Sequence, residues 1–321
     1  MSSTRGFEHR RTSPVLLFSL LAVASIASCS QPKPKDLHSD LRPYQAGSRI
    51  DLSDNPGDSS PRRACSYGFH AQKNGHVGLV TAVHCTNAGL DSSGHFYVFG
   101  ERIWQSFDYD ATVIATVSEK PDLLDKDTSE TCRTAIEDLG RYDLRWCLVA
   151  DAAFAPFSST VDYVAGAVAN VPLSVAETKI GPVDEKKYHS YTGYGFQPLE
   201  DQPLYKIGAT TGKTEGYLVS GIPVDLPVVL SPGAEEVVLL DLYSAQSYNS
   251  ATFADHGDSG GPIFHSYVGD SEGPFVLEGI VSAGTDYGLL FIEPLGDILD
   301  ALGVEVEHAG EGGGLGLPDG S

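Results

Sequence analysis

Apolar residues along this chain gather in short segments separated by polar residues and turn formers. Several segments are rich in Val, Ile, Tyr and Phe, and Gly, Asp, Asn or Pro bounds them, which is typical of β-strands. The expected strands lie in 76–83, 95–103, 111–117, 144–150, 236–245, 274–284 and 288–293. Only 296–303 has the pattern of a helix outside the N-terminal segment. Many short strands with turn signals predict an all-β barrel or sandwich.

The N-terminal segment has the pattern of an export signal. Basic residues precede the apolar stretch 14–28, which is too short to span a bilayer comfortably. It runs into Ile26-Ala27-Ser28-Cys29, which is similar to a bacterial lipobox, a motif whose cysteine carries lipid. Residues 1–28 are therefore expected to be a lipoprotein-type signal peptide. Ordinary signal cleavage near Ala24 or Ala27 is the alternative, and it would leave a secreted protein with a free thiol.

The residues that flank the strand-rich region lack the apolar content of a core. Residues 29–45 combine prolines with Lys and Asp, and they are expected to form a flexible tether that begins at the lipidated Cys29. Residues 307–321 are rich in glycine and are expected to be a disordered tail.

Charge narrows the choice of partners. The formal net charge of −22 argues against nucleic acid, which needs a basic surface, and against an electrostatic hold on anionic lipid. Membrane attachment is therefore expected only through the lipid anchor. The acidic stretch 51–58 does not have the spacing of an EF-hand loop, and no zinc-type Cys/His spacing or phosphate-binding glycine loop occurs. We expect neither a metal nor a cofactor.

Two short motifs carry residues that are used in nucleophilic catalysis. Thr81-Ala82-Val83-His84-Cys85 presents a histidine, and Gly257-Asp258-Ser259-Gly260-Gly261-Pro262 presents a serine among glycines. Between them, Asp110 enters the apolar, β-branched run 111–114. A serine hydroxyl is a poor nucleophile at neutral pH, so a base must take its proton. Histidine suits this work because its pKa lies near neutrality, and a buried carboxylate fixes its tautomer.

The glycines around Ser259 have a second use. The backbone N–H groups of Gly257 and Ser259 can be aimed at a developing oxyanion, which is typically worth ~3 kcal/mol per donor. Gly260 and Gly261 have no side chain, so another segment of backbone can approach them closely. Each motif alone is compatible with an ordinary turn or a surface histidine, but the ordered set indicates catalysis.

The order His84, Asp110, Ser259 is that of the chymotrypsin-type peptidases. Further segments follow in the same order: Cys65-Ser66-Tyr67-Gly68-Phe69, Lys206-Ile207-Gly208-Ala209-Thr210-Thr211-Gly212, Gly279-Ile280-Val281-Ser282-Ala283-Gly284 and Phe291-Ile292-Glu293-Pro294-Leu295. With them, the chain resembles the bacterial chymotrypsin-fold peptidases of the streptogrisin and alpha-lytic type. The resemblance implies an all-β fold of two six-stranded antiparallel β-barrels, 46–165 and 166–306, with a C-terminal helix and the triad in the cleft between them.

The acid of the triad has more than one candidate. The family frame is an acid, one residue, a small residue and two apolar residues. Asp110 fits this frame, whereas Asp108 would put Asp110 at the small position. Asp143 and Asp162 are more remote alternatives. The resemblance implies that Ser282 hydrogen-bonds the triad carboxylate.

Five cysteines leave one to explain in an exported protein. If Cys29 carries lipid, the remaining four can form the local bridges Cys65–Cys85 and Cys132–Cys147, the first of which resembles the family's opening disulfide loop. That bridge would tether the strand that carries His84, and it would stabilise the fold by about 3 kcal/mol.

The resemblance also assigns supporting and substrate-binding residues. Asp258 would form a buried ion pair with Lys206, the alternative being a solvated lysine. Substrate would lie extended against 282–284 and pair as an added strand. The expected substrate-binding residues are Phe253 at the pocket floor, Ser282, Ala283, Gly284 at the mouth and Leu290 on the wall. A floor without a carboxylate predicts an apolar substrate side chain of medium size.

The chain departs from the family pattern in three ways. Tyr205 and Glu215 stand where the family has a bridged cysteine pair, and the pocket bridge is missing as well. About 17 residues separate Cys29 from the first barrel, so no long pro-region fits and the protein is expected to fold unaided. Residues 118–165 are longer than the family's segment between the barrels.

These patterns together predict an exported, membrane-anchored serine endopeptidase. It would hydrolyse peptide bonds of a polypeptide substrate through an acyl-enzyme, and it would act as a monomer. The alternative is a catalytically silent protease-fold lipoprotein that serves as a binding or receptor protein. The presence of all three triad residues argues against that alternative.

Overall fold

The computed structural model describes most of the chain between Asp36 and Glu307. The described residues are 36–39, 41, 43–53, 63–86, 100–105, 113–173, 182–183, 187–198, 200, 202–230, 234–248, 252–266, 275–284 and 288–307. The expected signal peptide, Cys29, most of the tether and the glycine-rich tail lie outside these residues.

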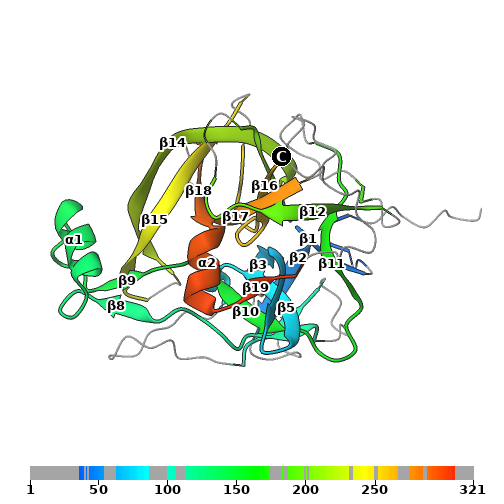
Figure 1. The fold of residues 1–321 in the computed structure, drawn as a ribbon, viewed down its shortest axis with the longest axis horizontal. Helices are drawn as coiled ribbons and strands as arrows, with labels where there is room; N and C mark the ends of the chain where they lie inside the picture. Colours follow the sequence, from blue (N-terminus) through cyan, green and yellow to red (C-terminus); the bar gives the residue numbers. More distant parts are fainter. Residues whose placement is uncertain are drawn as a thin grey trace, which may run out of the picture. The chain divides into compact units, whose positions relative to one another are not determined.

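The described residues are mostly β, with two α-helices (Figure 1). The first strands are β1 (Tyr44–Ala46), β2 (Arg49–Ser53), β3 (Arg63–Ser66), β4 (Phe69–Lys73), β5 (His76–Thr81), β6 (Arg102–Trp104), β7 (Ala115–Thr116), β8 (Leu123–Asp125), β9 (Trp146–Leu148) and β10 (Ala153–Pro156). The later strands are β11 (Tyr163–Ala169), β12 (Tyr188–Tyr194), β13 (Leu204–Gly208), β14 (Gly212–Val229), β15 (Glu236–Ser247), β16 (Pro262–Ser266), β17 (Phe275–Gly284), β18 (Leu289–Pro294) and β19 (Glu305–Val306). The helices are α1 (Glu130–Asp138) and α2 (Leu295–Leu302), and a short 3₁₀ turn covers Val83–Cys85.

Six strands of the C-terminal half pair in a closed circuit. The order is β13, β14, β15, β18, β17, β16 and back to β13, and every pairing in it is antiparallel. Some of their buried side chains, together with Phe253 from the loop before β16, form one apolar cluster: Leu204, Tyr243, Ala245, Phe253, Ile263, Val281, Leu290 and Ile292. A closed circuit leaves these six strands without an unpaired edge of their own, which protects the sheet from pairing with other chains.

Strands of the N-terminal half form most of two four-stranded sheets, and β19, from the end of the C-terminal half, adds the last strand to one of them. One has the order β10-β5-β4-β19 and the other β3-β2-β6-β7. β5 and β10 are antiparallel, with Thr81 opposite Ala153. Because of this register, the residues that follow β5 lie beside the residues that precede β10.

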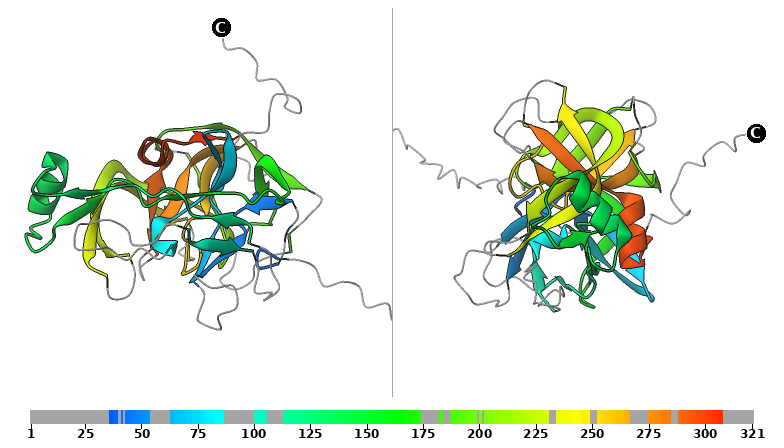
Figure 2. Two further views of the ribbon diagram at one scale, coloured as in Figure 1. Left: turned by 90° about the horizontal axis from the view of Figure 1, so that it is seen from below. Right: turned by 90° about the vertical axis from the view of Figure 1, so that its left-hand side faces the viewer.

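Residues 123–148 leave the N-terminal half and join the sheet of the C-terminal half. β9 pairs in parallel with β15, and β8 pairs with β9. Helix α1 packs Cys132, Ala135 and Ile136 into a small apolar cluster with residues of β15. Figures 1 and 2 show α1, β8 and β9 together at the far end of the long β14–β15 hairpin.

The predicted β class and the C-terminal helix are both present in the described residues, with α2 at the position expected for 296–303. Helix α1 was not predicted, because its buried residues, Cys132, Ala135 and Ile136, extend over little more than one turn and the residues around them are mostly polar or charged. Ser129 caps it by accepting a hydrogen bond from the Cys132 N–H at 3.3 Å. The two barrels and the boundary at 165 stay predictions. In the part of the chain described here, neither helix is long and apolar enough to cross a membrane.

Candidate active site

His84 is held on a buried aspartate. It lies in the 3₁₀ turn after β5, and its Nδ1 donates a hydrogen bond to Asp151 Oδ2 at 2.7 Å. The backbone N–H of His84 donates to Asp151 Oδ1 at 3.1 Å. Two bonds to the two oxygens of one carboxylate fix both the position and the tautomer of the imidazole, leaving Nε2 as its basic nitrogen.

Asp151 is in turn held by residues of the C-terminal half. Ser282 Oγ on β17 donates to Asp151 Oδ2 at 2.6 Å, and the Asp151 N–H donates to Glu293 Oε2 at 2.7 Å. Burial raises the pKa of Asp151, but the charge and hydrogen bond of His84 and the bond from Ser282 bring the pKa below its ordinary value. Burial lowers the pKa of His84, yet Asp151 raises it above its ordinary value. Asp151 is therefore charged at neutral pH, and it stabilises a proton on His84.

This contact corrects the predicted acid of the triad. The expected acid was Asp110, which lies outside the described residues, as does Asp108. Nδ1 carries a single hydrogen, and Asp151 accepts it, so the assignment moves from Asp110 to Asp151. The remote alternative Asp143 is a surface partner of Arg141.

A signal for Asp151 was present in the sequence. Asp151-Ala152-Ala153-Phe154-Ala155 has an acid, one residue, a small residue and two apolar residues, which is the same frame as that of Asp110. The frame therefore fits twice. What decides between the two is the pairing of β10 with β5, which places the residues before Ala153 beside the turn of His84.

Ser259 lies on a turn that packs against the N-terminal half. Its carbonyl accepts a hydrogen bond from the Ser66 N–H at 2.8 Å, and the N–H of Gly260 donates to Val281 O at 2.7 Å. Gly260 has a φ of +83°, and a Cβ there would lie 2.2 Å from Thr81 Oγ1. Only glycine allows this approach, which brings the Ser259 turn against the strand end that leads into His84.

The backbone N–H groups of Gly257 and Ser259 are available to a ligand. Gly257 has a φ of +97°. Its carbonyl oxygen accepts a hydrogen bond from Ser66 Oγ at 2.8 Å, which holds the peptide group between Gly257 and Asp258 in place. Within the described residues, neither the Gly257 N–H nor the Ser259 N–H donates a hydrogen bond. Two unpaired N–H groups on one tight turn form the kind of site that binds an oxyanion.

Asp258 anchors that turn from beneath. Its carboxylate forms a buried ion pair with Lys206 at 2.9 Å, so the structure brings together the two residues that the sequence pairs. It also accepts from the N–H groups of Thr210 and Thr211 and from Thr211 Oγ1. Burial raises the pKa of Asp258, but Lys206 and Thr211 bring it below its ordinary value. A carboxylate with this many donors holds the residues on either side of it rigidly.

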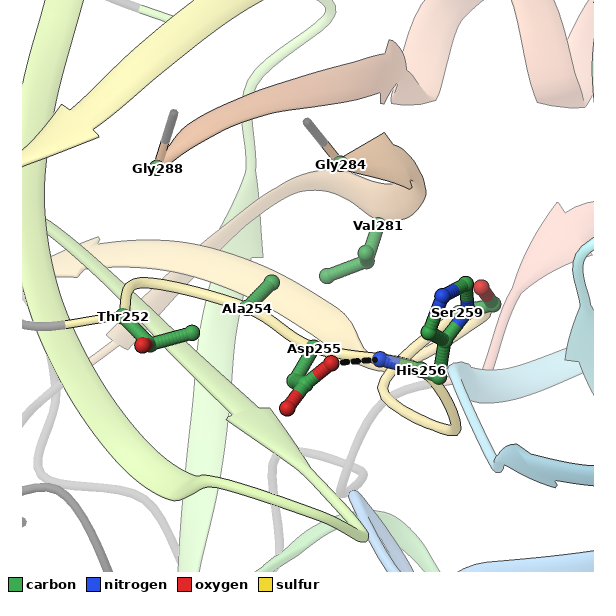
Figure 3. A pocket seen from close by; sticks show the side chains of 8 residues that line it. All are labelled: Thr252, Ala254, Asp255, His256, Ser259, Val281, Gly284 and Gly288. Atoms are coloured by element: carbon green, nitrogen blue, oxygen red, sulfur yellow. Dashed lines mark hydrogen bonds between the residues drawn. The ribbon is translucent and has the colours of Figure 1, made fainter. Parts of the chain in front are cut away.

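A pocket of about 250 Å³ opens beside Ser259. Its lining residues are Thr252, Ala254, Asp255, His256, Ser259, Val281, Gly284 and Gly288. Figure 3 shows the side chains of Ala254 and Val281 directed toward one another, while the Asp255 carboxylate points away from Val281. Small and apolar residues therefore shape the interior, and the polar residues lie at its exposed edge.

The predicted pocket residues take different places. Gly284 lines the pocket. Phe253 and Leu290 are fully buried in the apolar cluster of the C-terminal half and do not reach the pocket surface. Ser282 faces Asp151 instead of the pocket. Counting along the chain locates Phe253 but does not show that its ring packs beneath Gly216, where a Cβ would lie 2.8 Å from the ring.

Two disulfides are present. Cys65–Cys85 joins β3 to the residue after His84, and Cys132–Cys147 joins α1 to β9. Disulfides persist in oxidising compartments, so both are consistent with an extracellular protein. Among the described residues, no group of three or more His, Cys, Asp or Glu side chains is arranged to hold a metal ion. In the acidic stretch, Asp51 pairs with Arg49 at 2.9 Å, and residues 54–58 lie outside the described part.

Comparison with known proteins gives a structural likeness and no sequence family. No family model matches the chain, and no curated protein matches it in sequence. Solved structures of bacterial serine proteases are similar in fold. Thermobifida fusca Protease A is 18% identical with a TM-score of 0.49, covering 82% of this chain and 98% of that one. Cellulomonas bogoriensis chymotrypsin is 18% identical with a TM-score of 0.48, covering 82% and 98%. Nocardiopsis protease is 16% identical with a TM-score of 0.47, covering 80% and 96%. At these identities, what the chain does has to follow from its own side chains.

Proposed function

We propose that this protein is a serine endopeptidase in which Ser259 is the nucleophile, His84 the base and Asp151 the residue that orients it. The observation that carries the proposal is the 2.7 Å bond from His84 Nδ1 to a buried carboxylate, which leaves Nε2 basic. This histidine lies on a strand end that packs against the Ser259 turn. A histidine paired with a buried aspartate next to a glycine-framed serine has the chemistry of acyl transfer.

In the acylation step, the Ser259 hydroxyl attacks the carbonyl carbon of the peptide bond and its proton passes to His84 Nε2. Negative charge builds on the carbonyl oxygen, where the N–H groups of Gly257 and Ser259 stabilise it. His84 then gives its proton to the departing amine as the C–N bond breaks. Asp151 stays ionised throughout and stabilises the imidazolium.

In the deacylation step, water takes the place of the amine. His84 removes a proton from the water as it attacks the ester carbon, and returns that proton to Ser259 Oγ as the ester bond breaks. The product is a carboxylic acid, and the serine is regenerated.

The pocket beside Ser259 supports a preference for an apolar substrate side chain of medium size. Its interior is formed by Ala254, Val281 and Gly284, and the carboxylate of Asp255, which also lines the pocket, points away from Val281. Gly284 at the end of β17 is exposed and open, so an extended substrate can pair there as an additional strand.

The finer features of the fold and location belong to the same proposal. The closed circuit of β13 to β18 supports a C-terminal barrel, and the two four-stranded sheets support an N-terminal one. Both disulfides use cysteines other than Cys29, which leaves Cys29 for the lipid of an exported, anchored protein. Polypeptide is then the substrate, reached from the outer side of the membrane.

The test is active-site labelling of the full-length chain with a fluorophosphonate probe, which reacts with activated serines. We expect the wild type to be labelled, Ser259→Ala to stay unlabelled, and Ser220→Ala, a change on β14 away from the site, to be labelled like the wild type. A folded, disulfide-intact wild type that does not react would overturn the proposal and favour the binding-protein alternative.

A further inference from the structure

A second buried carboxyl group lies next to Asp151. Glu293 is the residue of β18 before Pro294 and helix α2, and its side chain is fully buried. Glu293 Oε2 accepts the hydrogen bond from the Asp151 N–H at 2.7 Å. Its other oxygen, Oε1, is buried and has no hydrogen-bond partner among the described residues.

The backbone of Asp151 depends on this bond. β9 ends at Leu148 and β10 begins at Ala153, so no strand ladder holds the residues between them. The N–H of Asp151 therefore finds its acceptor in a side chain. A buried N–H without an acceptor destabilises the fold, so the bond to Glu293 is a strong constraint on this segment.

We propose that Glu293 is a positioning residue of the active site, holding the Asp151 backbone so that both carboxylate oxygens of Asp151 meet His84. This inference rests on the proposed peptidase function for its kinetic consequences. The geometry from Glu293 to Asp151 to His84 is a single chain of hydrogen bonds that runs from β18 to the base. Through it, the C-terminal half sets the orientation of a histidine that belongs to the N-terminal half.

Glu293 acts in its neutral form. Burial raises its pKa well above the ordinary value, and the charges of Asp151, Asp297 on α2 and Asp241 on β15 raise it further. The residue opposite it on β17 is Ile280, which offers no compensating charge. A neutral carboxyl accepts the N–H through its carbonyl oxygen without adding a second negative charge beside Asp151.

Ionisation of Glu293 at alkaline pH would disturb this arrangement. A second carboxylate next to Asp151 repels it, and raises the pKa of His84 by adding negative charge behind Asp151. We expect the wild-type pH profile of kcat to show an alkaline decline that depends on Glu293.

Three variants separate these roles. Glu293→Gln keeps an acceptor of the same shape but cannot ionise, and Glu293→Leu removes the acceptor. Glu278→Gln is the matched control, because Glu278 is another buried glutamate whose pKa is raised, and its partner is His265 instead of Asp151. The measurements are kcat and KM from pH 6 to 10, and the ¹H resonance of the His84 Nδ1–H with its titration.

Positioning predicts a distinct result for each variant. Glu293→Gln should stay within about twofold of the wild-type kcat at pH 7 and lose the alkaline decline. Glu293→Leu should lower kcat by about 10–100-fold with little change in KM, as expected when a reacting group is misplaced by less than 1 Å. Its Nδ1–H resonance should shift or broaden. Glu278→Gln should match the wild type in all of these measurements.

Two results would overturn the inference. One is a Glu293→Leu variant that folds and keeps the wild-type kcat and His84 resonance. The other is a Glu293→Gln variant that keeps the alkaline decline, and this arm decides the question if the leucine variant does not fold. The His84 resonance can be followed even in a chain that does not react with fluorophosphonate, so failure of the peptidase function and failure of this inference give different outcomes.

Discussion

Two histidines on neighbouring elements of the N-terminal half have opposite acid–base properties. His84 follows β5 and lies on Asp151, while His70 lies on β4 among Tyr67, Phe157 and Tyr163, fully buried. Neither ring nitrogen of His70 has a hydrogen-bond partner among the described residues. Burial lowers the pKa of His70 to about 3, whereas Asp151 raises the pKa of His84 despite burial. A carboxylate partner raises the pKa of one histidine, and complete burial without such a partner lowers the pKa of the other.

The largest expected effect comes from making His84 resemble His70. Asp151→Asn replaces the carboxylate by an amide and removes the charge that stabilises the imidazolium. We expect kcat to fall by about 10⁴-fold, as when the acid of such a triad is neutralised, and the pKa of His84 to fall below that of the wild type. Steady-state kinetics and NMR titration of His84 measure both. A variant with wild-type activity would show that a different carboxylate, such as Asp110, serves His84.

An intermediate effect is expected from His70 through the pH dependence of stability. The folded-state pKa lies below the unfolded value of 6.5, so the unfolded chain binds more protons between the two values. The stabilisation that a neutral His70 adds to the free energy of unfolding is fully present above pH 6.5 and is lost as the pH falls toward 3. Between pH 6.5 and 5 the free energy of unfolding should fall by about 2 kcal/mol from this group.

Denaturant unfolding of His70→Phe at the two pH values provides the comparison. The variant should lose this part of the pH dependence, whatever its stability at neutral pH. If the free energy of unfolding of the variant differs between the two pH values as much as that of the wild type, His70 is already protonated, or hydrated, in the folded protein.

The smallest of the three effects is expected from Ser282. Its hydroxyl donates one of the bonds to Asp151 Oδ2, and the bonds from His84 remain when it is removed. Ser282→Ala should therefore lower kcat by about tenfold, which corresponds to ~1.4 kcal/mol, because one bond to a charged group is lost. Ser266→Ala, which changes a buried serine of β16, is the control and should leave kcat unchanged. An equal decrease of kcat in Ser282→Ala and Ser266→Ala would point to a general packing effect.

Sequence motifs locate those parts of the candidate site that are local in the chain. His84 and Ser259 lie in short motifs whose chemistry can be interpreted without a fold, and the same holds for the glycines around Ser259. The pairing of Lys206 with Asp258 needed the family resemblance, since the two are far apart in sequence. Helix α1 could have been suspected from Ser129 and Glu130, which form a typical helix start.

The roles of Asp151 and Phe253 could not be predicted from the sequence alone. Asp110 and Asp151 both fit the frame of an acid before small and apolar residues, and the strand register that chooses Asp151 is a tertiary fact. The position of Phe253 follows from counting, but its burial beneath Gly216 depends on packing between β14 and the loop before Ser259. In both cases local pattern gives the candidate, and long-range pairing decides its role.

The parallel pairing of β9 with β15 determines how the chain can be divided. β9 belongs to the sheet of the C-terminal half, and β10, five residues further on, belongs to a sheet of the N-terminal half. Asp151 lies in the crossing between them. A cut at the expected boundary near 165 would thus leave β8 and β9, which belong to the sheet of the C-terminal half, on the N-terminal fragment. The proposed catalytic acid is consequently a junction residue, and the two halves cannot be inherited, expressed or exchanged as independent modules without separating β9 from its sheet or Asp151 from His84.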